Sequence, residues 1–131
     1  MGAWEVGPFE NDTALDWVAD LRSGGAEAVR VALSAAADGF LDAREGEEVV
    51  AAAEVVASAL GEPAPNLPGD VTAWIATYGG ELSREDVALA RGAMARVVSE
   101  KSELRELWVE DAEDEEWPKA MEDLQRRLAA L

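Results

Sequence analysis

The chain has 131 residues, of which 28 are acidic and 11 are basic, so its formal net charge is −17. A surface with this charge repels phosphate backbones and anionic lipid headgroups, which argues against nucleic acid and membranes as direct partners. The sequence also contains no cysteine and no histidine, which excludes disulfides, thiolate zinc sites and every Ser-His-Asp or Cys-His catalytic arrangement.

Length and apolar content are those of one globular domain. A chain of 131 residues with 49% apolar residues can bury a self-sufficient core, so we expect a single helical domain over residues 1–131. No apolar run approaches the roughly 20 residues of a membrane span, and the first residues lack the basic and apolar regions of a signal peptide. These features predict a cytoplasmic protein.

Two glycines separate the first two predicted helices. Gly24 and Gly25 end the first helix, because paired glycines weaken a helix and readily adopt a left-handed C-cap conformation. The second helix is predicted from Ala26 to Leu41. In both segments the apolar residues follow helical spacing, with Ala14, Trp17, Val18 and Leu21 in the first and Val29, Leu33, Ala36 and Phe40 in the second.

The third predicted helix, from Glu47 to Leu60, is apolar on almost every side. It follows a polar break at residues 42–46, and after its first turn only Glu54 and Ser58 interrupt a run of alanine, valine and leucine. A helix that is apolar all round belongs in the interior of a fold. The sequence therefore predicts an all-α compact bundle of about five to seven helices around this alanine- and valine-rich helix.

Prolines and glycines mark the connection to the second half of the chain. Residues 61–69 contain three prolines and two glycines, which predicts a stiff connector. Asp70 is predicted to be the N-cap of a short helix that ends at Gly79 and Gly80. The apolar residues of this helix are Val71, Trp74, Ile75 and Tyr78.

The remaining helices are predicted between Ser83 and the C-terminus. Ser83 and Asp86 approximate a capping box, and the apolar pattern continues to Trp108 with a polar interruption at residues 100–102. This pattern allows one long helix or two. Residues 110–116 contain six carboxylates and are predicted to form an exposed loop. The last helix follows, with a stripe of Trp117, Met121, Leu124, Leu128 and Leu131.

The sequence contains no motif for catalysis or cofactor binding. No segment alternates with the period of a strand, and glycine-rich nucleotide loops and EF-hand calcium loops are absent. Asp12 and Asp16 have the i, i+4 spacing of a shared helix face, but a chain with 28 acidic residues produces such pairs by chance. We predict no catalytic residue, no metal site and no cofactor.

Glu54 is a candidate buried carboxylate, because it interrupts the most apolar predicted helix. A buried carboxylate needs a partner or has a shifted pKa. We expect Glu54 either to lie on a narrow exposed edge or to pair with an arginine. Examples of such an arginine are Arg30, Arg91 and Arg96.

The N-terminal segment carries a sequence motif. Its first 17 residues, MGAWEVGPFENDTALDW, resemble the start of a bacterial family, domain-of-unknown-function family 4259, whose members begin MGAWGxGxFEND followed by alanine, Asp-Trp and leucine. The matching residues are Gly2, Ala3, Trp4, Gly7, Phe9, Glu10, Asn11, Asp12, Ala14, Asp16, Trp17 and Leu21, whereas Glu5 replaces the usual glycine. The resemblance implies a small bacterial helical protein and no established activity.

Two interpretations of this segment remain open. In the structural one, Asn11 or Asp12 caps the first helix and the aromatic side chains close one end of the bundle. In the functional one, a recognition surface is formed by Trp4, Phe9, Asn11, Asp12 and Asp16. We favour the structural interpretation, because capping residues beside aromatic residues commonly begin a helix. The other four tryptophans fall on apolar stripes, which favours the core for Trp17, Trp74, Trp108 and Trp117.

Three functional hypotheses follow. The favoured one is a small, acidic, non-enzymatic interaction protein, of immunity or antitoxin-like type, whose acidic face covers a basic protein partner. The second is a carboxylate-based metal-binding or hydrolytic protein that uses Asp12, Asp16 or Glu54. The third is a structural domain with no site of its own, in which acidity serves solubility. The sequence does not indicate an oligomeric state.

Overall fold

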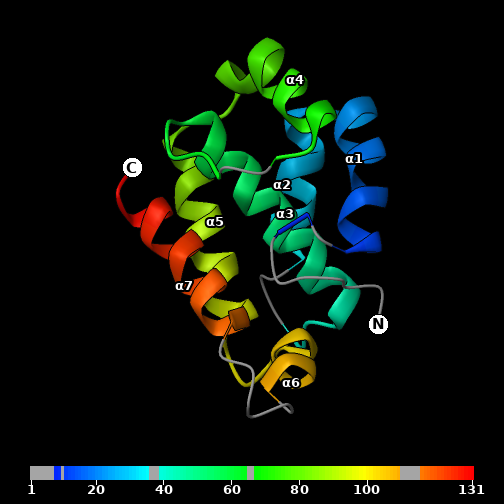
Figure 1. Ribbon diagram of the computed structural model, residues 1–131, viewed down its shortest axis with the longest axis vertical. Coiled ribbons are helices and arrows are strands. Elements are labelled where there is room, and N and C mark those ends of the chain that lie inside the picture. The colour runs from blue at the N-terminus through cyan, green and yellow to red at the C-terminus, as the bar shows by residue number, and fades with distance from the viewer. Residues whose placement is uncertain (1–7, 10, 36–38, 65–66, 110–115) are drawn as a thin grey trace.

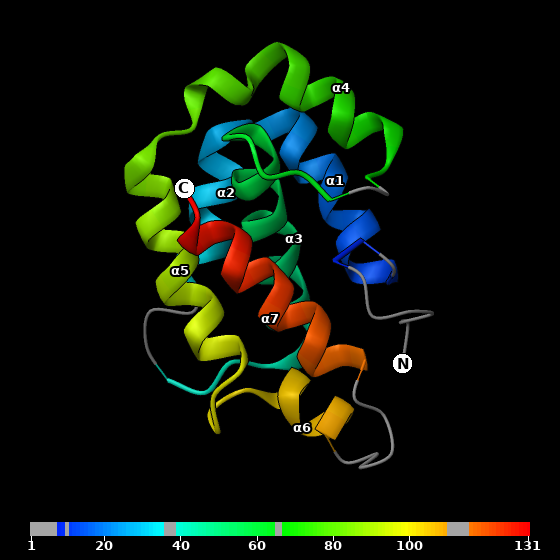
Figure 2. The ribbon, with the colours of Figure 1, turned by 60° about the vertical axis from the view of Figure 1, so that its left-hand side comes forward.

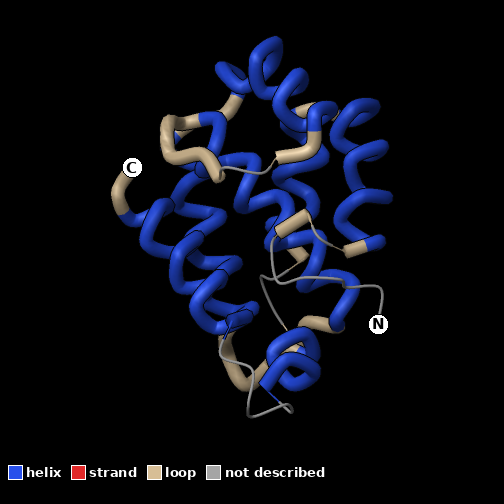
Figure 3. Tube along the Cα trace, in the orientation of Figure 1, coloured by secondary structure: helices blue, strands red, loops and turns tan. Residues whose placement is uncertain are grey.

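The computed structural model describes residues 8–9, 11–35, 39–64, 67–109 and 116–131 (Figure 1). These residues form seven α-helices and one 3₁₀ turn, and they contain no strand (Figure 3). The helices are α1 (Asp12–Gly24), α2 (Ala26–Ser34), α3 (Ala43–Ala59), α4 (Gly69–Tyr78), α5 (Arg84–Val97), α6 (Glu103–Val109) and α7 (Glu116–Ala129), and the 3₁₀ turn is η1 (Gly79–Glu81). None of the helices described is both long and apolar enough to cross a membrane.

The helix α3 lies at the centre of the bundle and contacts every other helix. Figure 1 shows α1 on one side of α3 and α5 and α7 on the other, and α2 packs against both α3 and α5. The helix α4 lies across one end of the bundle, and α6 lies at the opposite end (Figures 1 and 2). The predicted all-α bundle around a central alanine- and valine-rich helix is therefore confirmed.

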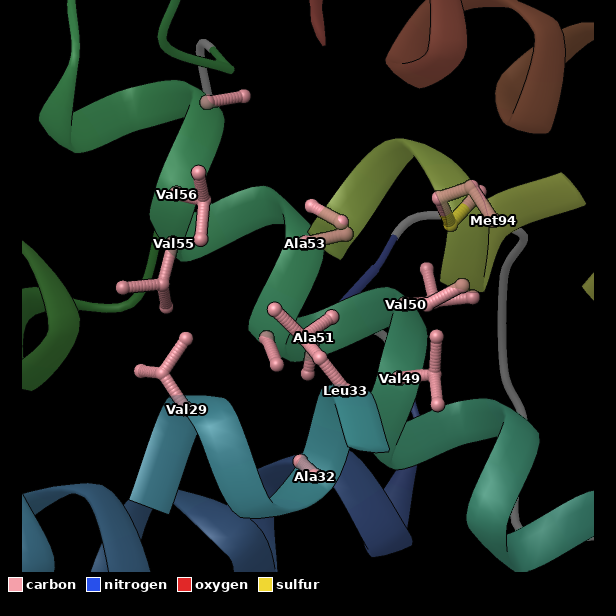
Figure 4. Close-up of a cluster of buried hydrophobic side chains, with 14 of the residues drawn as sticks. Val29, Ala32, Leu33, Val49, Val50, Ala51, Ala53, Val55, Val56 and Met94 are labelled. Atoms are coloured by element: carbon pink, nitrogen blue, oxygen red, sulfur yellow. The ribbon is translucent and has the colours of Figure 1, made fainter. Parts of the chain in front are cut away.

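The core is built on the middle of α3, where every residue from Val49 to Ala57 is buried. Valines and alanines of α3 face Val29 and Leu33 of α2 and Met94 of α5 (Figure 4). Burying a valine side chain stabilises a fold by about 1.5 to 3 kcal/mol, whereas the small alanines let neighbouring helix backbones approach closely. The sequence pattern of α3 therefore accounts for its central position and for the close approach of its neighbours.

The prediction that the second helix continues to Leu41 is wrong, because α2 ends at Ser34. Gly39 adopts a positive φ of 71°, and its carbonyl accepts a hydrogen bond from Arg96. Phe40 is consequently 55% exposed, whereas Leu41 is buried. Leu41 pairs its backbone with the segment before α6, donating to the Lys101 carbonyl at 2.8 Å. These contacts lie about 60 residues apart in sequence, so helical spacing alone did not indicate them.

Two predicted helix starts are also wrong. The helix α4 begins at Gly69, and the Pro68 carbonyl, rather than the Asp70 side chain, accepts from the first free N–H groups. The helix α3 begins at Ala43, inside the predicted polar break. Asp42 and Glu45 form a capping box there, with the Glu45 N–H donating to Asp42 Oδ1 at 2.8 Å. The polar residues 42–46 thus start a helix instead of separating two.

The segment from Ser83 to Trp108 forms two helices, α5 and α6. At the start of α5, the carboxylate of Asp86 accepts a hydrogen bond from the Ser83 N–H at 2.9 Å, as the predicted capping box requires. The polar interruption lies between the two helices, and the fully buried Ser102 accepts from the Arg105 N–H at 3.2 Å. This contact satisfies a free donor in the first turn of α6.

We predict opposite stability changes for alanine at two helical glycines. A Cβ at Gly46 of α3 would lie 3.1 Å from the Leu104 Cβ of α6, whereas a Cβ at Gly92 of α5 meets nothing within 4 Å. Gly92→Ala should raise the free energy of unfolding by about 0.5 to 1 kcal/mol through helix propensity. Gly46→Ala should lower it, because overpacking costs about 1 to 3 kcal/mol. Urea denaturation measures both, and a stabilised Gly46→Ala variant would contradict the close packing of α3 on α6.

Candidate functional site

The N-terminal motif supplies the cap of α1. Asn11 is the N-cap, and its Oδ1 atom accepts a hydrogen bond from the Ala14 N–H at 2.7 Å. Asn11 and Phe9 are both buried, and Phe9 belongs to the core cluster together with Trp17. Trp4 lies outside the described residues. For Phe9 and Asn11, the structure therefore places the side chains inside the fold.

The carboxylates of Asp12 and Asp16 are exposed on α1. Within the described residues, no three acidic side chains come together in an arrangement that could hold a metal ion. The recognition surface proposed from the sequence stays a prediction for these two residues. The structure brings neither of them into a cluster with Glu54, which lies in the core.

Glu54 is 0% exposed and forms a bidentate ion pair with Arg127 of α7. Both guanidinium Nη atoms donate to its carboxylate oxygens at 2.7 Å, and Ser58 Oγ donates to Oε2 at 2.8 Å. Both oxygens of Glu54 are thus held by donors of the fold. This arrangement satisfies a buried charge.

The expectation that Glu54 is buried and pairs with an arginine is confirmed, but the three arginines given as examples have other partners. Arg30 pairs with Asp86 at 2.9 Å, Arg91 donates to the Ala129 carbonyl, and Arg96 donates to the Gly39 carbonyl. The actual partner, Arg127, is 73 residues away in sequence. In the sequence it stands beside Arg126 at the end of the last helix, where both resemble ordinary cations that complement the helix dipole.

Arg127 joins three parts of the chain. Besides Glu54, its Nη1 atom donates to the Glu62 carbonyl at 3.0 Å, and its Nε atom donates to Asp123 Oδ2 at 2.9 Å. The hydrogen bond with Glu54 raises the pKa of Arg127, although burial opposes this shift. The guanidinium therefore stays charged and fixes α7 to α3 and to the connector that follows α3.

An open groove of about 370 Å³ lies between α1 and α2, beside α3. It is lined by Trp17, Asp20, Ser23, Gly24, Glu27, Ala28, Val31, Ala32 and Glu48. The lining includes apolar side chains of α1 and α2, which we call its floor, and each of α1, α2 and α3 contributes one carboxylate. Val31 in this lining is 63% exposed, although it lies on a helix whose other valine, Val29, is fully buried. We call this the α1–α2 groove.

The carboxylates of the α1–α2 groove are Asp20, Glu27 and Glu48. Within the part of the chain that the structure describes, no arginine or lysine forms a salt bridge with any of them. Partial burial raises the pKa of Glu48; Arg44 opposes this shift, and the nearby charge of Asp20 adds to it. A cation placed in the groove would therefore relieve repulsion between its carboxylates.

Glu47 is a second perturbed carboxyl, in the first turns of α3. It is buried, and its Oε2 atom has no hydrogen-bond partner in the described structure. Burial raises the pKa of Glu47 above its ordinary value of 4.5; a hydrogen bond with Thr13 opposes the shift, and the charge of Asp12 adds to it. Thr13 and Asp12, at the start of α1, thus influence the protonation of Glu47.

Comparison with protein families gives one match. The model of the family described as Domain of unknown function (DUF4259) matches residues 2–120, which include the N-terminal motif and the groove. No curated protein and no solved structure matches the chain.

We predict that Arg127→Met destabilises the protein far more than Arg126→Met. Removing Arg127 leaves the buried Glu54 charge without its partner, which costs about 3 to 5 kcal/mol. Arg126 is an exposed neighbour that pairs with Asp123 on the surface, and its loss should cost less than about 1 kcal/mol. Chemical denaturation of both variants gives the two free energies. Equal losses would contradict a structural role for the buried pair.

The pH dependence of stability should change in Glu47→Gln. Because the native-state pKa of Glu47 is raised, the native state binds this proton more tightly than the unfolded state, and ionisation of Glu47 opposes folding at neutral pH. Glu47→Gln should therefore be more stable than the wild type near pH 7, and the difference should shrink as the pH falls toward about 4. Exposed Glu122→Gln is the control, with a change below about 0.5 kcal/mol. A pH-independent difference for Glu47→Gln would contradict the shift.

Proposed function

We propose that this chain, which belongs to the DUF4259 family, is a non-enzymatic protein that binds a basic protein partner. The observation that carries the proposal is the excess of surface carboxylates over available cations. The chain has 28 acidic residues and 11 basic residues. A field of this sign attracts basic surfaces and accelerates their association.

Most of the arginines already pair with acceptors of the chain itself. Six arginines bind acceptors of the chain itself: Arg22, Arg30, Arg91, Arg96, Arg126 and Arg127. Arg30, for example, donates to Asp86 and holds the pKa of that carboxyl below its usual range. Because the chain has 28 acidic residues and only 11 basic ones, most of its carboxylates cannot pair with a cation of the chain itself. This supports a partner, rather than the chain itself, as the source of compensating charge.

An immunity or antitoxin-like factor is the finer form of this proposal. Such a factor covers a basic surface of its target, and a negative surface with an apolar groove suits that task. Carboxylate-based metal binding or hydrolysis has less support. Glu54 is held by Arg127 and Ser58. Asp12 and Asp16 are exposed on α1, and no three acidic groups of the described residues are arranged so that they could hold a metal ion.

The proposal predicts a partner that binds in a salt-dependent manner. The chain, immobilised at low ionic strength, should retain basic proteins from its native cytosol that an unrelated protein of equal negative charge does not retain. The dissociation constant of a purified partner should rise about tenfold or more between about 50 and 500 mM salt, because screening weakens electrostatic association. The proposal would be contradicted if no basic protein were retained beyond the acidic control.

A further inference from the structure

We propose that the α1–α2 groove is the docking site for a basic amphipathic helix of the partner protein. This inference rests on the proposed function and names the surface and the ligand chemistry through which it acts. The groove joins an apolar floor to carboxylates from three helices.

The apolar floor of the groove favours binding of an apolar side chain of the partner. Val31 is 63% exposed, and Trp17, Ala28 and Ala32 line the same groove. A valine that is mostly exposed contributes little to the stability of this chain, because its apolar surface stays in water. An apolar residue of a partner helix would bury that surface, as in other complexes in which an amphipathic helix occupies a groove.

The carboxylates of the groove favour basic side chains on both sides of the apolar stripe of the partner helix. Asp20, Glu27 and Glu48 come from α1, α2 and α3, respectively, and line the groove beside its apolar floor. Lysine and arginine carry an ammonium or guanidinium group on a long aliphatic stem, so they can cover apolar surface and still reach a carboxylate. The charge pattern of the groove is therefore complementary to a helix with an apolar stripe between basic residues.

Other occupants fit this surface less well. A polyamine would pair with the carboxylates but would leave the apolar surface of Val31 in water. Nucleic acid would bring phosphates toward three carboxylates and be repelled. A basic amphipathic helix can bury the apolar surface of the groove and also pair with its carboxylates.

The test uses a helical leucine–lysine peptide and polylysine as probes, at low salt. In the first variant, Asp20→Asn, Glu27→Gln and Glu48→Gln neutralise the groove. In the matched control, Glu85→Gln, Glu100→Gln and Glu122→Gln remove the same charge at exposed positions outside the groove lining. The groove variant should bind the leucine–lysine peptide about tenfold more weakly than the wild type, and the control less than about threefold more weakly.

Val31→Ser tests the apolar floor separately. This position is exposed, so the variant should fold as the wild type does. The substitution should lower the affinity for the leucine–lysine peptide about threefold or more and leave the affinity for polylysine unchanged. Only the leucine–lysine peptide carries apolar side chains that could bury the surface of Val31. Thermal denaturation verifies folding of every variant. If the groove variant does not fold, the affinities of Val31→Ser for the two probes test whether the groove is the docking site.

The outcomes separate this inference from the proposed function. Equal weakening by the groove variant and its control, or no effect of Val31→Ser, would overturn the groove as the docking site and leave the acidic field as the means of binding. Failure of the leucine–lysine peptide to bind the wild type would also overturn the groove. The proposed function would then be judged by the retention of basic proteins and its salt dependence.

Discussion

A single carboxylate in the most apolar helix sets the main constraint on this fold. Glu54 is completely buried in α3, and a buried charge is tolerated only when it is paired and hydrogen-bonded. Arg127 meets that need with two hydrogen bonds, and the same guanidinium reaches the Glu62 carbonyl and Asp123. A buried pair of this kind need not add net stability, but it disfavours arrangements that leave the charges apart. It therefore specifies where α7 docks on α3.

The sequence predicts what is local in this fold and misses what depends on distant contacts. The central helix follows from its all-round apolar surface, and the hydrogen bond from the Ser83 N–H to Asp86 follows from the spacing of a capping box. The end of α2 could not be predicted, because Leu41 leaves the helical path to pair with the backbone before α6. The partner of Glu54 was missed for the same reason: 73 residues separate it from Arg127.

The α1–α2 groove also depends on contacts between distant segments and could not be predicted from the sequence. The sequence marks Gly24 and Gly25 as helix terminators, and the structure confirms that α1 ends there, with Gly25 at a φ of 64°. The groove itself depends on how α1 and α2 then lie beside α3. Helical spacing places Val29 and Leu33 in the core, and it leaves open what Val31 contacts. Three separate helices each contribute one carboxylate to the lining of the groove, which no linear pattern indicates.

The buried pair is best tested by a double-mutant cycle with Glu54→Leu, Arg127→Met and the variant that carries both substitutions. Each single substitution leaves a charge or a cavity in the core, whereas the double variant removes both charges together. We expect the double variant to lose much less stability than the sum of the single losses, with a coupling of about 2 to 3 kcal/mol. Strictly additive losses would contradict the claim that Glu54 and Arg127 act as a pair that positions α7.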